Sequence, residues 1–433
     1  KNDSDQIMSN ISRRLILCLL LIIGMHSCTS KPEPIPAPSS SKSQFQTVLN
    51  YEAMAQAKKG IEAGDSLYII PFQLLKSQAS EMMELDPPSI LDKKYPPPSG
   101  DIHDYTSMGP YWWPDPDTED GLPYIRKDGV VNPERAQFDK VPGATMAEAV
   151  KAFVLMYYFT GEEIFAQKAA EFLKVWFLNP ATRMNPNMNY GQFIPGRSAG
   201  RSVGIIESRN FVFLAEYEPL LKKSTYWTDE DHIQFKAWMT AFLDWLVTSD
   251  LGQEEQARAN NHGSWCDFQL LALSQYCGNP EVGKEVAGSI QSNRLEKQID
   301  KWGAQPEELE RTKSYSYSVF NLSALVRIAI LADNYGIDLS LHNGGHSALK
   351  PAIDYLIPFA LGEKKWKYTQ ISSMDGSNEK MIFLLTYSQS KWPDERYNHA
   401  LIKLGSLYPE SRYILTTSAS IEMNSGQKLE ENQ

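Results

Sequence analysis

Residues 144–177 read ATMAEAVKAFVLMYYFTGEEIFAQKAAEFLKVWF and contain two apolar helical patterns separated by a glycine. In each half, apolar residues recur three and four positions apart, which is the spacing of one face of an α-helix. Gly161 lies between the halves, where glycine can adopt the left-handed conformation that ends a helix. The stretch therefore predicts two consecutive helices, Ala144–Phe159 and Glu162–Phe177.

The same pattern returns along most of the chain. It predicts further helices over Ile206–Leu221, Asp229–Val247, Ser264–Cys277, Ser316–Tyr335 and Ala348–Leu361. No alternation of apolar and polar residues is long enough to predict a sheet, and no repeat of fixed period is evident. The succession of helices favours an all-α fold, an (α/α) toroid in which helix pairs form an incomplete barrel.

Two long segments, 103–134 and 179–204, are not predicted to be helical because Pro, Gly and Asp are frequent in them. Loops of this length inside a compact body are usually functional or disordered. Their aromatic residues argue against disorder. We therefore expect them to be active-site loops.

The composition of the 433 residues excludes several protein classes. With 42% hydrophobic and 11% aromatic residues, the chain is neither disordered nor collagen-like. Its net charge of −11 argues against general nucleic-acid binding, which needs a basic surface. Four cysteines without a CxxC pair form neither a disulfide framework nor a typical zinc site. No nucleotide-binding or zinc-protease motif is present, so we predict no cofactor and no metal.

The N-terminal region reads as an export signal, and Met8 is a plausible start. Arg13 and Arg14 precede the apolar run Leu15–Met25, which is shorter than the roughly 20 residues that span a bilayer. Cys28 follows a small residue, as in a relaxed bacterial lipoprotein box, and a Pro/Ser-rich linker comes next. The alternative is an ordinary cleaved signal with an incidental cysteine. We predict a signal peptide over 1–27, a lipoprotein linker with lipidated Cys28 over 28–43, and one toroid domain over 44–433.

The first candidate for chemistry is Asn260-Asn261-His262, just before a predicted helix. A helix N-terminus presents free N–H groups and partial positive charge, which favour a carboxylate ligand. An amide and an imidazole there could bind a carboxylate and move a proton. Alternatively, Asn260 or Asn261 only caps the helix, and His262 only forms a hydrogen bond.

The second candidate is ERTKSYSYS at residues 310–318. Arginine suits planar recognition of carboxylates, and tyrosine can act as an acid or base when a nearby cation lowers its pKa. On a continuous helix Arg311 would share a face with Tyr315, so pairing with Tyr317 requires the chain to break near Ser314. The alternative is a capped amphipathic helix with buried tyrosines.

The third candidate is the stretch 179–209, which is locally basic in an acidic protein. Its four arginines, which include Arg183, face a single acid, Glu207. This pattern indicates a site for an anionic polymer, although a solvated loop is the alternative. Tyr111-Trp112-Trp113, in the other long loop, either stacks on sugar rings or fixes that loop to the body. The expected substrate contacts are Tyr111, Trp112, Trp113, Gln192, Arg197, Arg201, Arg209 and Tyr315.

Together these motifs resemble one enzyme family. NNHGSW at 260–265 resembles the Asn-Asn-His motif of alginate lyases with helical toroid folds. RTKSYSYSVFNL at 311–322 resembles their Arg…Tyr motif. The loops PYWWPDP and IPGRSAGRSVGIIESRN are similar to those of the Bacteroidetes-type members, grouped as polysaccharide lyase family 38. The resemblance covers about residues 103–322.

The resemblance implies metal-independent β-elimination on a uronate polysaccharide, alginate first. Together with the N-terminal signal, it predicts an exported enzyme of the periplasm or outer membrane, which we expect to be a monomer. Asn261 and Arg311 would neutralise the uronate carboxylate. Tyr317 would protonate the leaving oxygen, and His262 would remove the C5 proton when that proton lies on the opposite face. The alternatives are a lyase for another polyuronate such as glucuronan, a hydrolase using Asp267 and Glu310, and a non-catalytic glycan-binding lipoprotein.

Overall fold

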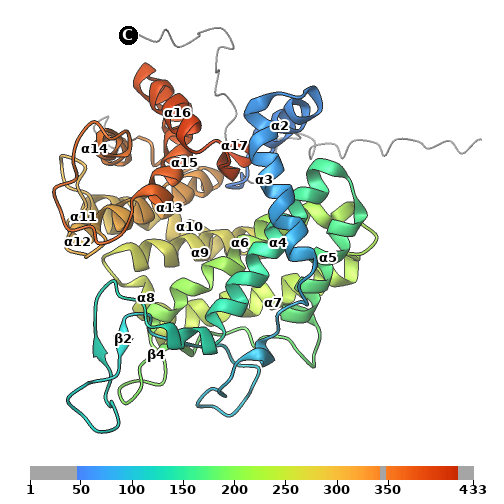
Figure 1. Ribbon diagram of the computed structural model, residues 1–433, viewed down its shortest axis with the longest axis vertical. Helices are drawn as coiled ribbons and strands as arrows, with labels where there is room; N and C mark the ends of the chain where they lie inside the picture. The colour runs from blue at the N-terminus through green and yellow to red at the C-terminus, as the bar shows by residue number, and fades with distance from the viewer. Residues whose placement is uncertain (1–45, 342–347, 418–433) are drawn as a thin grey trace, which may run out of the picture. The chain divides into compact units, whose positions relative to one another are not determined.

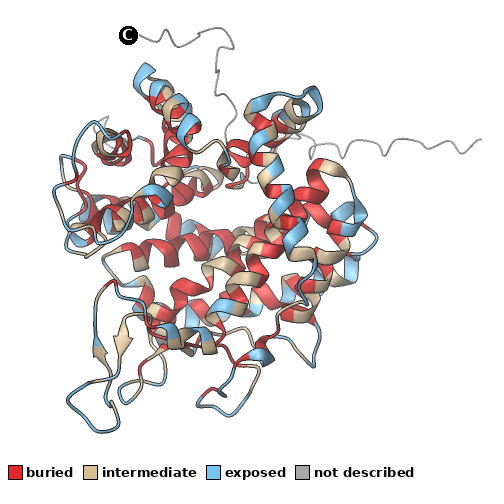
Figure 2. Ribbon diagram, in the orientation of Figure 1, coloured by how far each residue is buried: buried red, intermediate tan, exposed pale blue. Residues whose placement is uncertain are grey.

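The computed structural model describes residues 46–341 and 348–417. The predicted signal peptide, the linker and Cys28 lie outside the described residues. An inner row of helices is formed by α4 (Lys140–Thr160), α6 (Arg209–Tyr217), α9 (Asn261–Cys277), α13 (Ser314–Ala332) and α15 (Asp375–Lys391), and each contacts the next (Figure 1). Helices α4, α9 and α13 are buried on most of their faces (Figure 2), as expected for helices that are apolar nearly all round.

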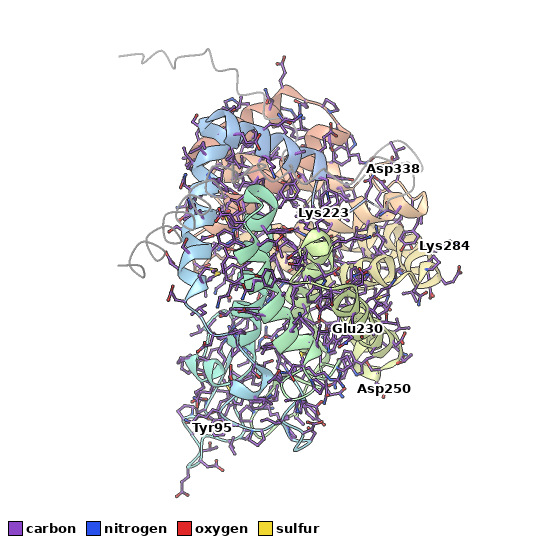
Figure 3. The ribbon with its side chains drawn as sticks, turned by 90° about the vertical axis from the view of Figure 1, so that its right-hand side faces the viewer. Tyr95, Lys223, Glu230, Asp250, Lys284 and Asp338 are labelled. Atoms are coloured by element: carbon purple, nitrogen blue, oxygen red, sulfur yellow. The ribbon has the colours of Figure 1, made fainter. Side chains whose placement is uncertain are left out.

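An outer row covers these helices. It consists of α5 (Glu163–Leu173), α7 (Asp229–Thr248), α10 (Pro280–Ile290), α14 (Leu349–Ala360) and α16 (Glu395–Leu407), each packed against an inner helix. The outer surface carries charged side chains such as Glu230 on α7 and Lys284 on α10 (Figure 3).

Three further helices connect the ends of the inner row. Helix α15 contacts α17 (Arg412–Thr416), α17 contacts α3 (Ser66–Met83), and α3 contacts α4; α2 (Tyr51–Ala63) packs on α3 and α17. The predicted all-α fold, an incomplete (α/α) toroid, is confirmed.

The boundaries of the helices differ from the predictions in places. The predicted helix Ile206–Leu221 is divided into η4 (Ser202–Glu207), α6 and η5 (Glu218–Lys223). Pro219 lies at the start of η5, and a proline cannot donate the hydrogen bond that would continue α6.

The sequence did not predict helices α2, α3, α10, α15 and α16. Helix α3 contains Pro71, and α10 is short and contains two glycines. Proline and glycine weaken the sequence pattern of a helix.

The two long loops come together through short strands. Strand β1 (Thr106–Met108) pairs in parallel with β4 (Tyr190–Phe193), which joins the first loop to the second. Strand β2 (Trp112–Trp113) pairs antiparallel with β3 (Ile125–Arg126) inside the first loop. Strands β2 and β4 lie at the lower end of the molecule in Figure 1. The loops are therefore ordered by their own hydrogen bonds and by one another.

Candidate active site

Arg311 and Tyr317 form a direct pair at the start of α13. Helix α12 (Pro306–Leu309) ends and α13 begins at Ser314, so Arg311 lies in the non-helical segment between them. Its Nη2 donates to the Tyr317 hydroxyl at 2.8 Å, and its guanidinium carbon lies 3.9 Å from the centre of the Tyr317 ring. The chain thus breaks where the Arg311–Tyr317 pairing required it to break.

Tyr315 lies in the core and not beside Arg311. It is 0% exposed, its hydroxyl donates to Asn378 at 2.7 Å, and its ring packs edge-on against Trp366. The structure does not support the prediction that Tyr315 contacts substrate. The reason is the helix start at Ser314: residues 315 and 317 are two positions apart on α13 and so point in very different directions.

The first loop supplies Tyr111, whose hydroxyl lies 3.0 Å from that of Tyr317. Burial raises the pKa of Tyr317, Tyr111 adds to the effect, and Arg311 opposes it. The sequence led us to expect that a neighbouring cation would lower this pKa. Arg311 does act in that direction, but burial outweighs it. Tyr317 is therefore a protonated phenol at neutral pH, ready to donate a proton.

Asp128 ties the first loop to Arg311. Its carboxylate accepts from Arg311 Nη2 at 3.0 Å and from the Thr312 hydroxyl at 2.9 Å. Partial burial would raise the pKa of Asp128, but the bonds from Arg311, Thr312 and Arg126 lower it to about 2. Asp128 is thus ionised at any working pH and keeps the guanidinium beside Tyr317.

His262 is oriented by a buried carboxylate. Asn260 is the N-cap of α9 and accepts from the His262 N–H at 3.1 Å, as the capping alternative proposed. The His262 ring is also fixed, because Nδ1 lies 2.6 Å from Oε1 of Glu255, a residue of α8 (Asp250–Gln256) that is 0% exposed. A carboxylate only accepts hydrogen bonds, so Nδ1 carries a proton, and in the neutral form of the ring the lone pair is on Nε2.

Asn261 is held in the first turn of α9 by Glu308 of α12. Its backbone N–H and its side-chain Nδ2 donate to the two Glu308 oxygens at 2.7 and 2.8 Å. Asn261 is 0% exposed, and its Oδ1 has no hydrogen-bond partner among the described residues. Burial raises the pKa of Glu308, while Asn261, Arg311 and His262 oppose that rise. Glu308 therefore lies close to both sequence motifs and joins them.

The second loop places its arginines on Trp112. The guanidinium groups of Arg197 and Arg201 lie 5.5 and 5.7 Å from the centre of that ring. Arg201 also donates to the carbonyl and side chain of Gln192, whose φ of 48° is unusual for a residue with a side chain. Burial and nearby arginines lower the pKa of Arg201 to about 10, so it remains charged at neutral pH. These contacts fix the loops, and Arg197 remains exposed.

Other predicted contacts have different surroundings. Trp113 donates from Nε1 to the Val130 carbonyl at 3.0 Å, which fixes the first loop to itself. Arg209 lies over the rings of Trp265 on α9 and Phe320 on α13, at 5.6 and 5.2 Å from their centres.

The carboxylates near the motifs already have partners. Asp267 is buried and paired with Arg294 at 2.6 Å, and Glu310 is exposed. Glu255 and Glu308 are bound to His262 and Asn261. The hydrolase alternative needs two carboxyl groups positioned on one glycosidic bond, and this arrangement does not favour it.

Sequence reasoning missed Glu255, Glu308 and Asp128. Glu255 lies five residues before the Asn-Asn-His motif and Glu308 lies three residues before Arg311, yet no local pattern distinguishes them from surface acids. Their burial was the missing information.

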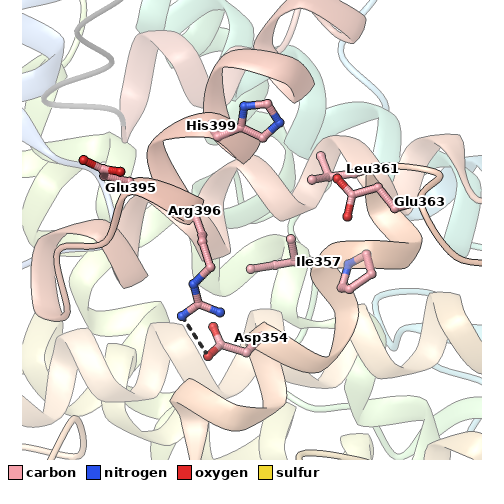
Figure 4. Close-up of a pocket in the computed structure, with 8 residues that line it drawn as sticks. Asp354, Ile357, Leu361, Glu363, Glu395, Arg396 and His399 are labelled. Atoms are coloured by element: carbon pink, nitrogen blue, oxygen red, sulfur yellow. Dashed lines mark ion pairs between the residues drawn. The ribbon is translucent and has the colours of Figure 1, made fainter.

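A separate pocket of about 390 Å³ lies between α14 and α16 and contains none of these residues (Figure 4). Asp354, Glu363 and Glu395 line it, and Arg396 is paired with Asp354 at 3.7 Å. Its acidic lining is unsuited to a polyanion.

Known proteins that are similar to this chain are alginate lyases. The family model described as alginate lyase matches residues 89–366. An alginate lyase from Bacteroides ovatus, solved as a crystal structure, is 36% identical; the match covers 87% of this chain and 99% of that one, with a TM-score of 0.81. A variant of alginate lyase A1-III complexed with a tetrasaccharide is 14% identical over 82% of this chain and 91% of that one, with a TM-score of 0.52, a likeness of fold. No curated protein sequence matches the chain.

Proposed function

The chain belongs to the alginate lyase family and is a polysaccharide lyase, and on this premise we propose that it cleaves alginate by β-elimination with Tyr317 and His262 as the proton-transferring groups. Two contacts are the main support for the proposal. Tyr317 is hydrogen-bonded to Arg311 and lies next to Tyr111, and Glu255 orients the ring of His262 in the second motif. An acid that is protonated and a base that has a free lone pair are what the reaction requires.

The first requirement is to make the C5 proton of a uronate acidic. The negative charge of the adjacent carboxylate opposes proton removal, so cationic or hydrogen-bonding groups must neutralise it. Arg311 carries a fixed charge at the site. Nδ2 of Asn261, in the positive first turn of α9, has a second N–H besides the one that it donates to Glu308. We assign carboxylate binding to these two residues.

The second requirement is a pair of proton transfers. Nε2 of His262 takes the C5 proton, the C5–H electrons form the C4=C5 double bond, and the C4–O4 bond breaks. The departing O4 takes the phenol proton of Tyr317. Tyr317 becomes a phenolate, which the adjacent Arg311 stabilises. When the C5 proton and O4 lie on one face of the sugar, Tyr317 has to serve both steps: its phenolate, which Arg311 stabilises, first takes the C5 proton, and the phenol so formed then gives that proton to O4.

The substrate is tested with a panel of defined polymers. Purified protein is incubated with polymannuronate, polyguluronate and glucuronan, and the ultraviolet absorbance of the new C4=C5 double bond is followed. We expect the largest rate on one of the two alginate polymers. A largest rate on glucuronan would indicate the other polyuronate, and binding without absorbance would indicate a glycan-binding protein. New reducing ends without absorbance would indicate a hydrolase.

We expect chelation of divalent metals to leave the rate unchanged. The charge-neutralising role belongs to Arg311 and Asn261, and within the described ranges no three His, Cys, Asp or Glu side chains gather into a metal-ligand group. The measurement is the rate after dialysis against EDTA, with untreated enzyme as the control. A loss that calcium or manganese restores would contradict the metal-independent mechanism.

We also propose that the protein is an exported lipoprotein anchored through Cys28, as its N-terminal sequence suggests. Globomycin, which blocks lipoprotein signal cleavage, should cause the precursor to accumulate. A Cys28→Ser protein should leave the membrane fraction while keeping its activity. Equal membrane association of the two proteins would show that the anchor is absent.

A further inference from the structure

The first turn of α13 leads into Tyr317, but the residue at its N-cap does not stabilise it. Lys313 occupies that position, and its side chain makes no capping hydrogen bond. The first N–H groups of an α-helix have no partner inside the helix, and a buried N–H without a partner is unfavourable. In α13 the Tyr317 N–H donates to the Lys313 carbonyl at 2.9 Å. The preceding N–H groups, those of Ser314, Tyr315 and Ser316, therefore need acceptors from elsewhere.

All three acceptors come from two consecutive residues that lie 55 positions further along the chain. The Ser314 N–H donates to the Thr369 carbonyl at 3.1 Å. Oε1 of Gln370 accepts from the N–H groups of Tyr315 and Ser316 at 3.1 and 3.4 Å, and Nε2 of the same amide donates to the Ser316 hydroxyl at 2.9 Å. An N-cap side chain normally accepts from the second or third N–H of its own helix. Gln370 performs this role from another part of the chain.

The same part of the chain also holds the break between α12 and α13. We call residues 369–371 the capping segment. The Ile371 N–H donates to the Thr312 carbonyl at 3.0 Å, and Gln370 and Lys313 form an isolated antiparallel bridge. The capping segment thus contacts both the non-helical residues before α13 and the first turn of the helix.

The local sequence does not explain why the chain breaks here. Pro306 begins α12, and no proline or glycine follows before α13 ends, so the residues that most often interrupt helices are absent. A continuous helix would place Arg311 on the face of Tyr315. With the break, Arg311 donates to the Tyr317 hydroxyl at 2.8 Å. The contacts of the capping segment, and not the local sequence, therefore favour the Arg311–Tyr317 pair.

We propose that Gln370 is a positioning residue, which caps α13 from outside the helix and thereby holds the Tyr317 hydroxyl beside Arg311. It acts through the helix that carries the acid and does not touch the substrate. The inference rests on the proposed function, which assigns the proton transfer to Tyr317. Gln370 lies beyond residues 89–366, so the family model does not include it.

The test uses Gln370→Leu, with Gln370→Glu as the conservative variant. Leucine accepts no hydrogen bond, whereas a glutamate carboxylate can accept from both N–H groups and is favourable at a helix N-terminus. We expect Gln370→Leu to lower kcat about 10- to 100-fold, the effect of a small misplacement of a catalytic group. KM should stay within about twofold of wild type, because Asp128 still holds Arg311. Gln370→Glu should restore most of kcat.

Asn50→Leu is the matched control for the loss of a helix cap. Oδ1 of Asn50 also accepts from the second and third N–H groups of a helix, at 3.1 and 3.0 Å in α2. Helix α2 contains no residue of the candidate site and lies well apart from α12 (Figure 1). Both leucine variants should have a lower melting temperature, because each removes a cap. Only Gln370→Leu should lose kcat.

A double-mutant cycle identifies the group through which Gln370 acts. In the Tyr317→Phe background the hydroxyl is already absent, so adding Gln370→Leu should lower kcat no further. Hydrogen exchange in the first turn of α13 is measured on the same proteins, since it requires no activity. The N–H groups of Tyr315 and Ser316 should exchange faster in Gln370→Leu than in wild type or Asn50→Leu.

Wild-type kcat in Gln370→Leu, no recovery in Gln370→Glu, or the same further loss in the Tyr317→Phe background would overturn the proposal. If Gln370→Leu does not fold, Gln370→Asn, whose shorter amide cannot reach both N–H groups, takes its place in every comparison. If wild type cleaves no polyuronate while the first turn of α13 exchanges faster in Gln370→Leu, the proposed function is wrong and the cap stands. If exchange is unchanged, Gln370 does not cap the helix and the proposal fails.

Discussion

Tyr317→Phe is expected to lower kcat by at least about 100-fold, the lower end of general acid–base effects. The substitution removes only the phenol oxygen, which receives a hydrogen bond from Arg311 and lies 3.0 Å from the Tyr111 hydroxyl. The ring and its contact with the guanidinium remain, so circular dichroism and thermal unfolding should show an intact fold. The measurement is kcat on the preferred polymer.

Tyr315→Phe is the matched control, two residues away on the same helix. It removes a hydroxyl that donates to Asn378 inside the core, and the loss of one buried hydrogen bond costs about 1 kcal/mol of unfolding free energy. We expect a lower melting temperature with kcat close to wild type. Loss of kcat in Tyr315→Phe together with an active Tyr317→Phe would show that the acid has been assigned to the wrong tyrosine.

Removing the base should have the other large effect, and it should depend on the substrate. His262→Ala is expected to lower kcat by about 100-fold or more on the uronate whose C5 proton faces away from O4, again within the range of general acid–base catalysis. On the epimer with both groups on one face, the phenolate of Tyr317 can take the C5 proton and pass it to O4, so the loss should be smaller. The measurement is kcat of His262→Ala and of Tyr317→Phe, each on polymannuronate and on polyguluronate.

Glu255→Gln tests the orientation of the imidazole separately from its presence. A glutamine can still contact Nδ1, but its amide can donate as well as accept, so the proton is no longer fixed on Nδ1. We expect the same substrate dependence as in His262→Ala with a smaller loss.

The His232–Glu218 pair provides a control, since its Nδ1 and carboxylate are 2.8 Å apart and it lies in another part of the chain. His232→Ala should leave kcat unchanged. Equal losses on both epimers in His262→Ala would contradict its role as the base for one of them.

The sequence predicted much of the fold because helix formation is largely encoded locally. Apolar spacing located α4, α7, α9 and α13 within a few residues, and Gly161 and Gly278 marked the ends of α4 and α9. It failed where the pattern was short or interrupted. Helix α15 carries polar residues in its first half, which obscure the helical pattern, and its buried residues pack between α13 and α16.

The candidate site was predictable in its residues but not in its contacts. The motifs identified Asn261, His262, Arg311 and Tyr317, all of which the structure places at the starts of α9 and α13. The buried acids beside them gave no sequence signal, because the burial that distinguishes a positioning carboxylate from a surface one depends on the whole fold.

By itself, the sequence determined the helical class, the two irregular loops and the identity of the chemical groups, since all of these follow from neighbouring residues. Only the tertiary structure decided which tyrosine meets Arg311, and which acid meets which partner. Asp128 and Arg311 are 183 positions apart, and Asn261 and Glu308 are 47 positions apart. Contacts over such separations are set by the packing of the inner helices and the closure of the loops. The same packing, through the burial it imposes, keeps Tyr317 protonated although a cation lies against its ring.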